Sequence, residues 1–218
     1  MANHSNLKLI MALWKYNKKI LISAPCPDVY LLFGEEKVNE TFVSTIAVDN
    51  CYSNTDFWVG MDCPENYEIS RLQVDNIKIF RKNFKSYDLP ANSLFVDVAK
   101  PNNGIIDMFR MKSENTCFAW FHHSLGISLH LALWIGFRRI HFVGLKPNGY
   151  ENTMLRTFLY EFCKMADEFG IDCISCTQKS SMNGFIDYFP VEEALELSRK
   201  NTCITPIRFN NFTWLSTN

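Results

Sequence analysis

Short apolar runs alternate with helix-like segments along this 218-residue chain. Mainly apolar runs of strand length, bounded by Asp, Asn, Gly or Pro, are typical of buried strands. Their alternation with helices predicts an α/β fold with a mostly parallel sheet, a Rossmann-like three-layer sandwich of about six or seven strands. The runs that we interpret as strands are residues 19–24, 41–48, 57–61, 77–80, 94–98, 139–145 and 171–175.

The helices predicted between these strands differ in how their apolar residues are distributed. From Ser124 to Gly136 the chain is apolar nearly all round, which is typical of a helix packed between a sheet and other helices. Residues 155–169 place apolar side chains at steps of three and four, the period of an amphipathic helix. Further helices are predicted at 29–37, from Pro64 and at 191–200. The residues expected in the core are Leu131, Trp134, Ile135, Ile140, Phe142 and Val143.

Composition narrows the class of protein without indicating a chemistry. Hydrophobic residues make up 47% of the chain and charged residues 21%, which excludes a disordered or fibrous protein. The 22 Lys and Arg nearly balance the 23 Asp and Glu, so nucleic-acid binding is not indicated. No repeat or long linker divides the sequence, which predicts one α/β domain over 1–218, with its core in 19–200 and residues 201–218 unassigned.

Whether the eight cysteines form disulfides depends on the cellular compartment in which the protein is expected to lie. The N-terminal residues lack the pattern of an export signal, and the longest mainly apolar stretch, residues 125–137, is too short to span a membrane. We therefore expect a cytoplasmic protein whose cysteines are thiols. Cys173 and Cys176 form the one CxxC, but residues three apart on a strand point to opposite faces. No metal site is predicted.

Polar residues follow the predicted strands where a parallel sheet binds its ligands, outside the carboxyl ends. Asp28, Asn50, Asp62 and Lys146 lie at or near such ends. The helix that begins at Ser124 adds unpaired backbone N–H groups, which suit a phosphate or a carboxylate. The sequence therefore predicts a cleft for a nucleotide and a second substrate.

The motifs of several large enzyme classes are absent. The chain has no GxGxxG after its first strand, no GxxxxGK[ST], no GxSxG and no HExxH. These absences argue against GxGxxG dinucleotide enzymes, P-loop enzymes, α/β-hydrolases and zinc peptidases.

Several segments together resemble a known group of proteins. They are a strand that ends near Pro27-Asp28, a strand that ends at Val48-Asp49-Asn50, the segment 56–62, and Ser124-Leu-Gly followed by a helix and by residues 135–145. This pattern, over roughly Lys19 to Leu197, resembles the bacterial and phage sialyltransferase-like families. These families include motility accessory factors that modify flagellin and an archaeal pterin pyrophosphokinase group. The resemblance implies a transferase that moves a sugar from a nucleotide sugar, which is a substrate and not a cofactor, to an acceptor that the sequence does not identify.

The resemblance also suggests roles for the candidate residues. The residues expected to bind the nucleotide are Pro27, Asp28, Asn50, Ser124, Leu125, Gly126 and Lys146. The candidate catalytic residues are His123 and Asp62, because a histidine with a pKa near 6.5 or a carboxylate suits removal of a proton from an acceptor hydroxyl. Each has a simpler interpretation, as a loop residue, a turn former or, for Ser124, a helix N-cap. His130 and His141 are expected to be structural.

A second function stays open. Members of the group usually carry Gly-x-Gly-Pro-Ser near the first strand and an Asp two residues after the glycine that matches Gly144. This chain has Ala24-Pro-Cys-Pro-Asp28 and Lys146 at those places. A catalytically inactive relative, phage-encoded or accessory, that binds a nucleotide, another ligand or a protein would fit these departures. Assembly into a homo-oligomer is open on either interpretation.

Overall fold

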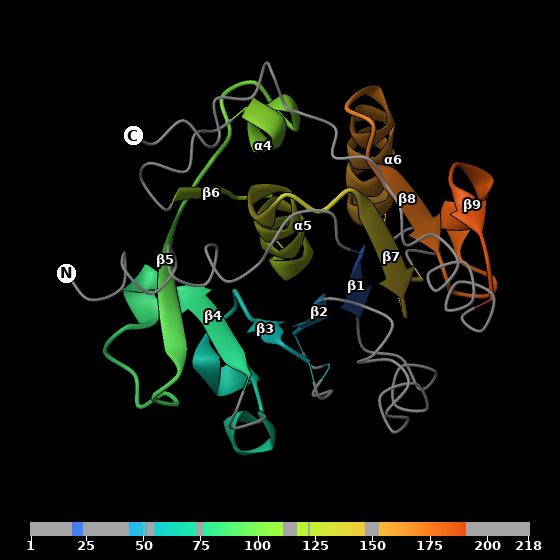
Figure 1. Cartoon of the computed structure of the whole chain (residues 1–218). Coiled ribbons are helices and arrows are strands. Elements are labelled where there is room, and N and C mark those ends of the chain that lie inside the picture. The colour runs from blue at the N-terminus through green and yellow to red at the C-terminus, as the bar shows by residue number, and fades with distance from the viewer. Residues whose placement is uncertain are drawn as a thin grey trace.

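The computed structural model describes residues 19–23, 44–49, 51, 55–72, 76–110, 117–121, 123–146 and 153–190. Within these ranges, nine strands form one sheet in which every pairing is parallel (Figure 1). Three α-helices accompany the sheet in the described part of the chain. The predicted fold class, α/β and Rossmann-like with a parallel sheet, is confirmed.

The order of the strands reverses once. They are β1 (Lys19–Ser23), β2 (Ser44–Val48), β3 (Phe57–Val59), β4 (Ile77–Arg81), β5 (Ser93–Ala99), β6 (Cys117–Ala119), β7 (Arg139–Val143), β8 (Asp172–Ser175) and β9 (Asp187–Tyr188). Across the sheet they follow the order β6-β5-β4-β3-β2-β1-β7-β8-β9. The chain thus builds outward from β1 to β6 and then returns to the other side of β1 with β7.

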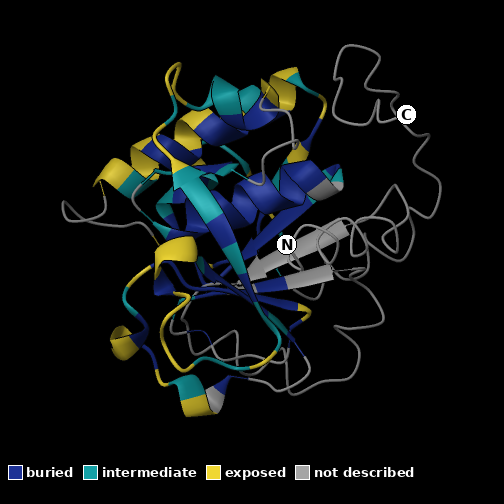
Figure 2. Cartoon of the chain, turned by 90° about the vertical axis from the view of Figure 1, so that its left-hand side faces the viewer, coloured by how far each residue is buried: buried dark blue, intermediate teal, exposed yellow. Residues whose placement is uncertain are grey.

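The helices form a layer on one face of the sheet. They are α4 (Ile106–Arg110), α5 (Ser124–Ile135) and α6 (Thr153–Glu168). Buried side chains of all three share one apolar core with the strands, and Figure 2 shows α5 buried over almost all of its described length. On the opposite face, Tyr67 and Leu72 pack against Trp58 and Phe80; they follow the 3-10 helices η1 (Pro64–Asn66) and η2 (Ile69–Arg71).

Most predicted elements are present, and the differences concern short ones. All seven predicted strands occur in the sheet, but the helix expected from Pro64 is a single 3-10 turn. The sequence does not predict β6, β9 or α4, because elements of two to five residues give no periodic pattern. The helices predicted at 29–37 and 191–200 lie outside the described residues.

Alternation along the strands fixes which side chains face the helices. On β3, Phe57 and Val59 join the core under the helices, whereas Trp58 joins the cluster on the opposite face. Cys173 and Cys176 likewise face opposite sides, as predicted, and the cysteines of the described ranges form no disulfide. Of the expected core residues, Leu131, Trp134, Ile140, Phe142 and Val143 are buried; the side chain of Ile135 is outside those described.

Helix α5 runs back across the sheet between two parallel strands. It follows β6 and precedes β7, so its N-terminus lies at the carboxyl edge of the sheet and its C-terminus at the amino edge. Gly136 ends it with φ of 93°, and its N–H donates to the carbonyls of Ala132 and Leu133. The geometry brings the first turn of α5 to the edge where parallel sheets bind ligands. Among the described helices, none is long and apolar enough to cross a bilayer.

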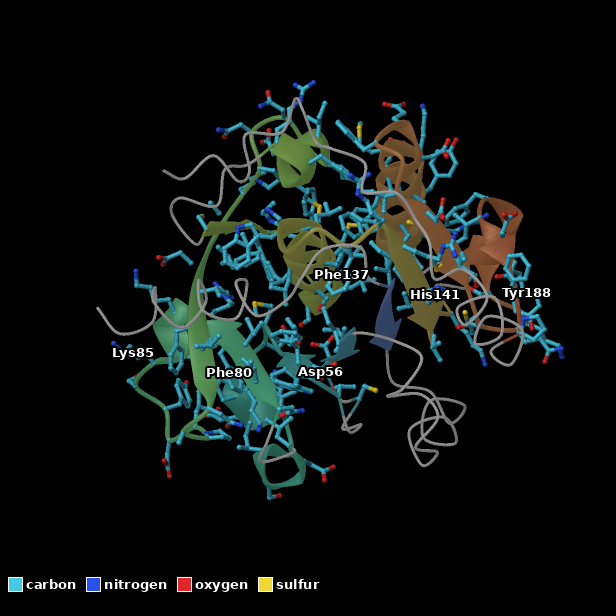
Figure 3. All side chains as sticks on the ribbon, viewed as in Figure 1. Asp56, Phe80, Lys85, Phe137, His141 and Tyr188 are labelled. Carbon is cyan, nitrogen blue, oxygen red and sulfur yellow. The ribbon has the colours of Figure 1, made fainter. Side chains whose placement is uncertain are left out.

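Two buried histidines have structural positions, as expected. His141 lies within β7 with its Nδ1 3.8 Å from the Cys176 sulfur (Figure 3). His130 lies in the middle of α5, where Nδ1 accepts a hydrogen bond from the Ala119 N–H at 2.9 Å and ties the helix to β6. Burial lowers the pKa of His130 from 6.5 to about 4.

The buried His130 predicts an acid-labile fold. Because its pKa is lower in the folded state, the unfolded state binds the extra proton, and stability present above pH 6.5 is lost as the pH falls toward 4. We expect this residue alone to lower the free energy of unfolding by about 3 kcal/mol over that range. Urea unfolding at several pH values, with His130→Asn as the comparison, measures it. Equal pH slopes in the two proteins would contradict the assignment.

Candidate functional site

A cluster of polar side chains lies where the carboxyl ends of β2 and β3 meet the N-terminus of α5. Asp49 directly follows β2, and its Oδ1 accepts a hydrogen bond from the Ser124 hydroxyl at the start of α5. The same Ser124 oxygen accepts a hydrogen bond from the Met61 N–H at 3.0 Å. These bonds join residues 75 and 63 positions apart in the chain, so the fold, and not a local turn, assembles the cluster.

Tyr67 completes this group, which we call the Asp49 cluster: Asp49, Tyr67 and Ser124. The Tyr67 hydroxyl donates to Asp49 Oδ1 at 3.1 Å and accepts from the Asp62 N–H at 2.9 Å. Its ring packs edge-on against Trp58, with 5.0 Å between ring centroids. The side chain of Asp62 is exposed beside the cluster. One carboxylate oxygen of Asp49 therefore receives two hydroxyl donors from different parts of the chain.

The backbone of Asp49 fixes the direction of its side chain. Its φ is 52°, in the left-handed region that Asp and Asn enter more readily than most residues. Its N–H donates to the Val59 carbonyl at 3.0 Å, and its own carbonyl accepts from Trp58 Nε1 at 2.8 Å. Asp49 is thus attached to β3 on both sides of its Cα, which holds the carboxyl group toward α5.

The surroundings of Asp49 make its carboxylate a stronger base than an exposed one. Burial raises the pKa of its carboxyl group; the hydrogen bonds from Ser124 and Tyr67 oppose this, and the negative charge of Asp62 adds to it. Burial and the charge of Asp49 also raise the pKa of Tyr67, which keeps the phenol protonated as a donor. A carboxyl group with a raised pKa at the ligand-binding edge of a sheet is a candidate for proton transfer.

His123 is the N-cap of α5, which corrects the alternative interpretation of Ser124 as the cap. The Nδ1 of His123 accepts a hydrogen bond from the Gly126 N–H at 3.0 Å, and Ser124 is the first helical residue. The ring also packs edge-on against Phe158, with centroids 4.5 Å apart. Because the capping nitrogen accepts, a neutral ring carries its proton on Nε2. Action as a general base would therefore break the cap.

Gly126 and Leu125 serve the first turn in different ways. A Cβ on Gly126 would lie 3.4 Å from both the His123 ring and the Phe121 side chain, so glycine allows the capping ring to lie close to the helix. The side chain of Leu125 is buried in the core. These two residues can contribute backbone N–H groups to a ligand, not side-chain contacts.

The remaining predicted site residues are more dispersed. Lys146 is exposed just after β7, which β1 separates from β2. Pro27, Asp28 and Asn50 lie outside the described residues. The structure therefore brings together Asp62, His123, Ser124, Leu125 and Gly126, with Lys146 farther along the same edge. Their roles in binding and catalysis stay predictions.

Sequence reasoning did not find Tyr67, and it did not place Asp49 among the site residues. No local signal marks Tyr67, because it reaches the cluster by packing on Trp58. Asp49 does carry a signal, since it is the first polar residue after an apolar run that ends a strand. The same position also suits an ordinary turn residue.

A cavity of about 710 Å³ lies apart from this edge, between α6, β8 and β9. Its lining includes the ion pair of Arg139 and Asp172 at the amino ends of β7 and β8, and none of the predicted site residues. Within the described ranges, no group of three or more His, Cys, Asp or Glu side chains is arranged to hold a metal ion.

The fold and this edge define an α/β, Rossmann-like domain with a polar cluster at the carboxyl ends of its strands. Comparison of the chain with models of protein families, with curated proteins and with solved structures gave no match.

Proposed function

We propose that this protein transfers a sugar from a nucleotide sugar to a hydroxyl group of an acceptor, with the Asp49 cluster at the reaction centre. One observation carries the proposal: a half-buried carboxyl group with a raised pKa is held between two strand ends and the first turn of α5. This edge is where parallel α/β sheets bind nucleotides. The resemblance of the sequence to sialyltransferase-like families supports the same chemistry.

The first turn of α5 supplies groups for the donor. The N–H groups of Ser124 and Leu125 precede the first possible intrahelical bond, and with the helix dipole they favour a phosphate. Gly126 keeps that turn free of a Cβ. Lys146 adds a positive charge farther along the edge, and the predicted roles of Pro27, Asp28 and Asn50 belong to the same binding site.

Asp49 is the proposed proton acceptor. Its carboxylate removes the proton of the acceptor hydroxyl while that oxygen forms a bond to the anomeric carbon. The bond between the anomeric carbon and the phosphate oxygen breaks, and the nucleotide leaves with the electron pair. The donors Tyr67 and Ser124 orient Oδ1, and Oδ2 makes no hydrogen bond with any described residue. In its neutral form His123 carries its proton on Nε2, and Asp62 lies exposed beside the cluster for contacts with the acceptor.

The second candidate function is binding without catalysis. Two observations favour it: Lys146 stands where the families that the sequence resembles usually carry an Asp, and the Ser124 hydroxyl is already engaged by Met61 and Asp49. On this alternative, the same edge binds a nucleotide and the protein acts through a partner.

Nucleotide binding and donor cleavage separate the two functions. We expect cytidine or uridine nucleotides at millimolar concentration to raise the melting temperature, because a ligand that binds the folded state stabilises it. Release of free nucleotide from a nucleotide sugar in the presence of acceptor would support the transferase over the binding protein. A salt of matched ionic strength is the control. If no nucleotide changes the melting temperature, the transferase and the nucleotide-binding form of the alternative both fail.

A further inference from the structure

Arg81, the last residue of β4, is held between two aromatic rings. Its guanidinium carbon lies 5.6 Å from the ring centroid of Phe84 and 5.2 Å from that of Trp120. Phe84 belongs to the 3-10 helix η3 (Lys82–Phe84), and Trp120 directly follows β6. Both rings attract the cation through their faces and restrict its movement. The side chain is half-buried in this position.

This guanidinium has no counter-charge among the residues that the structure describes. No carboxylate there pairs with Arg81, and its buried Nε makes no hydrogen bond. The next residue is different, because Lys82 forms an ion pair with Asp97 at 2.7 Å. A buried donor of a charged group without an acceptor is unfavourable unless a ligand supplies one.

The register of the sheet places Arg81 on the strand next to the segment that contacts the Asp49 cluster. Val59 of β3 pairs with Ile79 of β4, so Arg81 is level with Met61, whose N–H donates to Ser124. Adjacent strands are about 4.8 Å apart, so the backbone of Arg81 lies one strand away from that of Met61. The side chain of Ile79 faces the core under the helices. Two residues farther on, Arg81 emerges on the same face of the sheet, the one that α5 covers.

We propose that Arg81 binds an anionic oxygen group of the substrate, either a phosphate of the nucleotide or a carboxylate of the transferred sugar. The assignment of that group to a nucleotide sugar rests on the proposed function. The planar fork of arginine matches both groups with two parallel hydrogen bonds. The rings of Phe84 and Trp120 preorganise it, which lowers the entropy lost on binding.

Titration calorimetry with five probes tests this assignment. The probes are inorganic pyrophosphate, cytidine monophosphate, uridine monophosphate, cytidine and N-acetylneuraminate, and the proteins are the wild type, Arg81→Gln, Arg81→Lys and the control Lys82→Gln. We expect Arg81→Gln to weaken the binding of the anion that Arg81 holds by about 10- to 100-fold, the effect of losing charge-assisted hydrogen bonds. Arg81→Lys, which loses the fork, should also weaken it. Cytidine should bind all four proteins alike, and Lys82→Gln should behave as the wild type.

The probes distinguish the source of the anion. If the Arg81 variants bind pyrophosphate and cytidine monophosphate more weakly but bind N-acetylneuraminate as the wild type does, the anion held by Arg81 is the phosphate. The reverse result identifies it as the carboxylate. Trp120→Leu keeps the charge but removes one ring, so it should weaken the same probe by a smaller factor. This variant and Arg81→Lys keep the test decisive if Arg81→Gln does not fold.

Failure of this inference differs from failure of the proposed function. If the wild type binds cytidine monophosphate or N-acetylneuraminate and the Arg81 variants bind both equally well, the role of Arg81 is overturned and nucleotide binding stands. If pyrophosphate binding depends on Arg81 but neither cytidine monophosphate nor uridine monophosphate binds more tightly than pyrophosphate, the anion site stands and the proposed function is overturned. Absence of binding by every anion overturns both.

Discussion

Gly60→Ala is expected to lower the free energy of unfolding by about 3 kcal/mol or more, through overpacking of the core. A Cβ at this position would lie 2.1 Å from Cη2 of the Trp58 ring and 2.6 Å from Cζ3. The ring cannot yield easily, because Trp58 is fully buried between Tyr67 and Phe80. In a chain of this size the change corresponds to a fall in melting temperature of roughly 6–12 °C. Thermal and urea unfolding measure it.

Two further variants isolate the cause of that loss. Gly184→Ala is the matched control, since a Cβ there would meet nothing within 4 Å, and it should change stability by no more than about 0.5 kcal/mol. Adding Trp58→Phe to Gly60→Ala removes the atoms that clash, so the double variant should lose less than the sum of the two single losses. Strictly additive losses would show that the clash is not the mechanism.

Asp49→Asn should lower the rate of sugar transfer by about 100- to 10,000-fold, the usual contribution of a general base. Its amide oxygen can still accept from Ser124 and Tyr67, so the cluster and nucleotide binding should persist. Stability should be retained or increased at neutral pH. The pKa of Asp49 is raised in the folded state, so ionisation as the pH rises through that value disfavours the fold, and asparagine removes this penalty. Single-turnover transfer assays and melting curves at several pH values measure both effects.

Other carboxylates provide the comparison for Asp49. Asp88→Asn changes an exposed side chain away from the cluster and should alter neither rate nor stability. Asp62→Asn tests the candidate that the sequence predicts as catalytic, and on our proposal its effect falls on acceptor binding more than on the rate. If Asp49→Asn transfers sugar at the wild-type rate while Asp62→Asn or His123→Gln loses most of that rate, the catalytic residue is Asp62 or His123, as the sequence predicts, and not Asp49.

The fold could be predicted because the sequence of a buried parallel strand is a continuous run of apolar residues. The segment from Ser124 to Val143 shows this best, since an apolar helix, a glycine in the left-handed conformation and a buried strand follow in the predicted order. The N-cap of α5 was harder to assign. Statistics favour serine as a cap, but histidine can also accept the N–H, and the Ser124 hydroxyl is taken by Met61 and Asp49 from distant parts of the chain.

The site could be predicted only where the topology dictates it. The rule that ligands bind at the carboxyl ends of parallel strands leads to Asp62 and Ser124. It does not lead to Tyr67 or Arg81, which depend on packing between segments. Arg81 ends its strand like many surface arginines, and its special setting arises because Trp120, 39 positions later, covers it.

The return of the chain to β1 has a consequence for its synthesis. Lys19 of β1 pairs with Arg139 of β7, so one side of this central strand lacks its partner until 120 more residues have been made. At ordinary translation rates that interval lasts roughly 6 to 24 seconds. During it, the hydrogen-bonding groups of β1 form an open sheet edge, the kind of surface that pairs with other chains and aggregates. A fragment that stops before β7 would carry that open edge permanently, at what becomes the middle of the finished sheet.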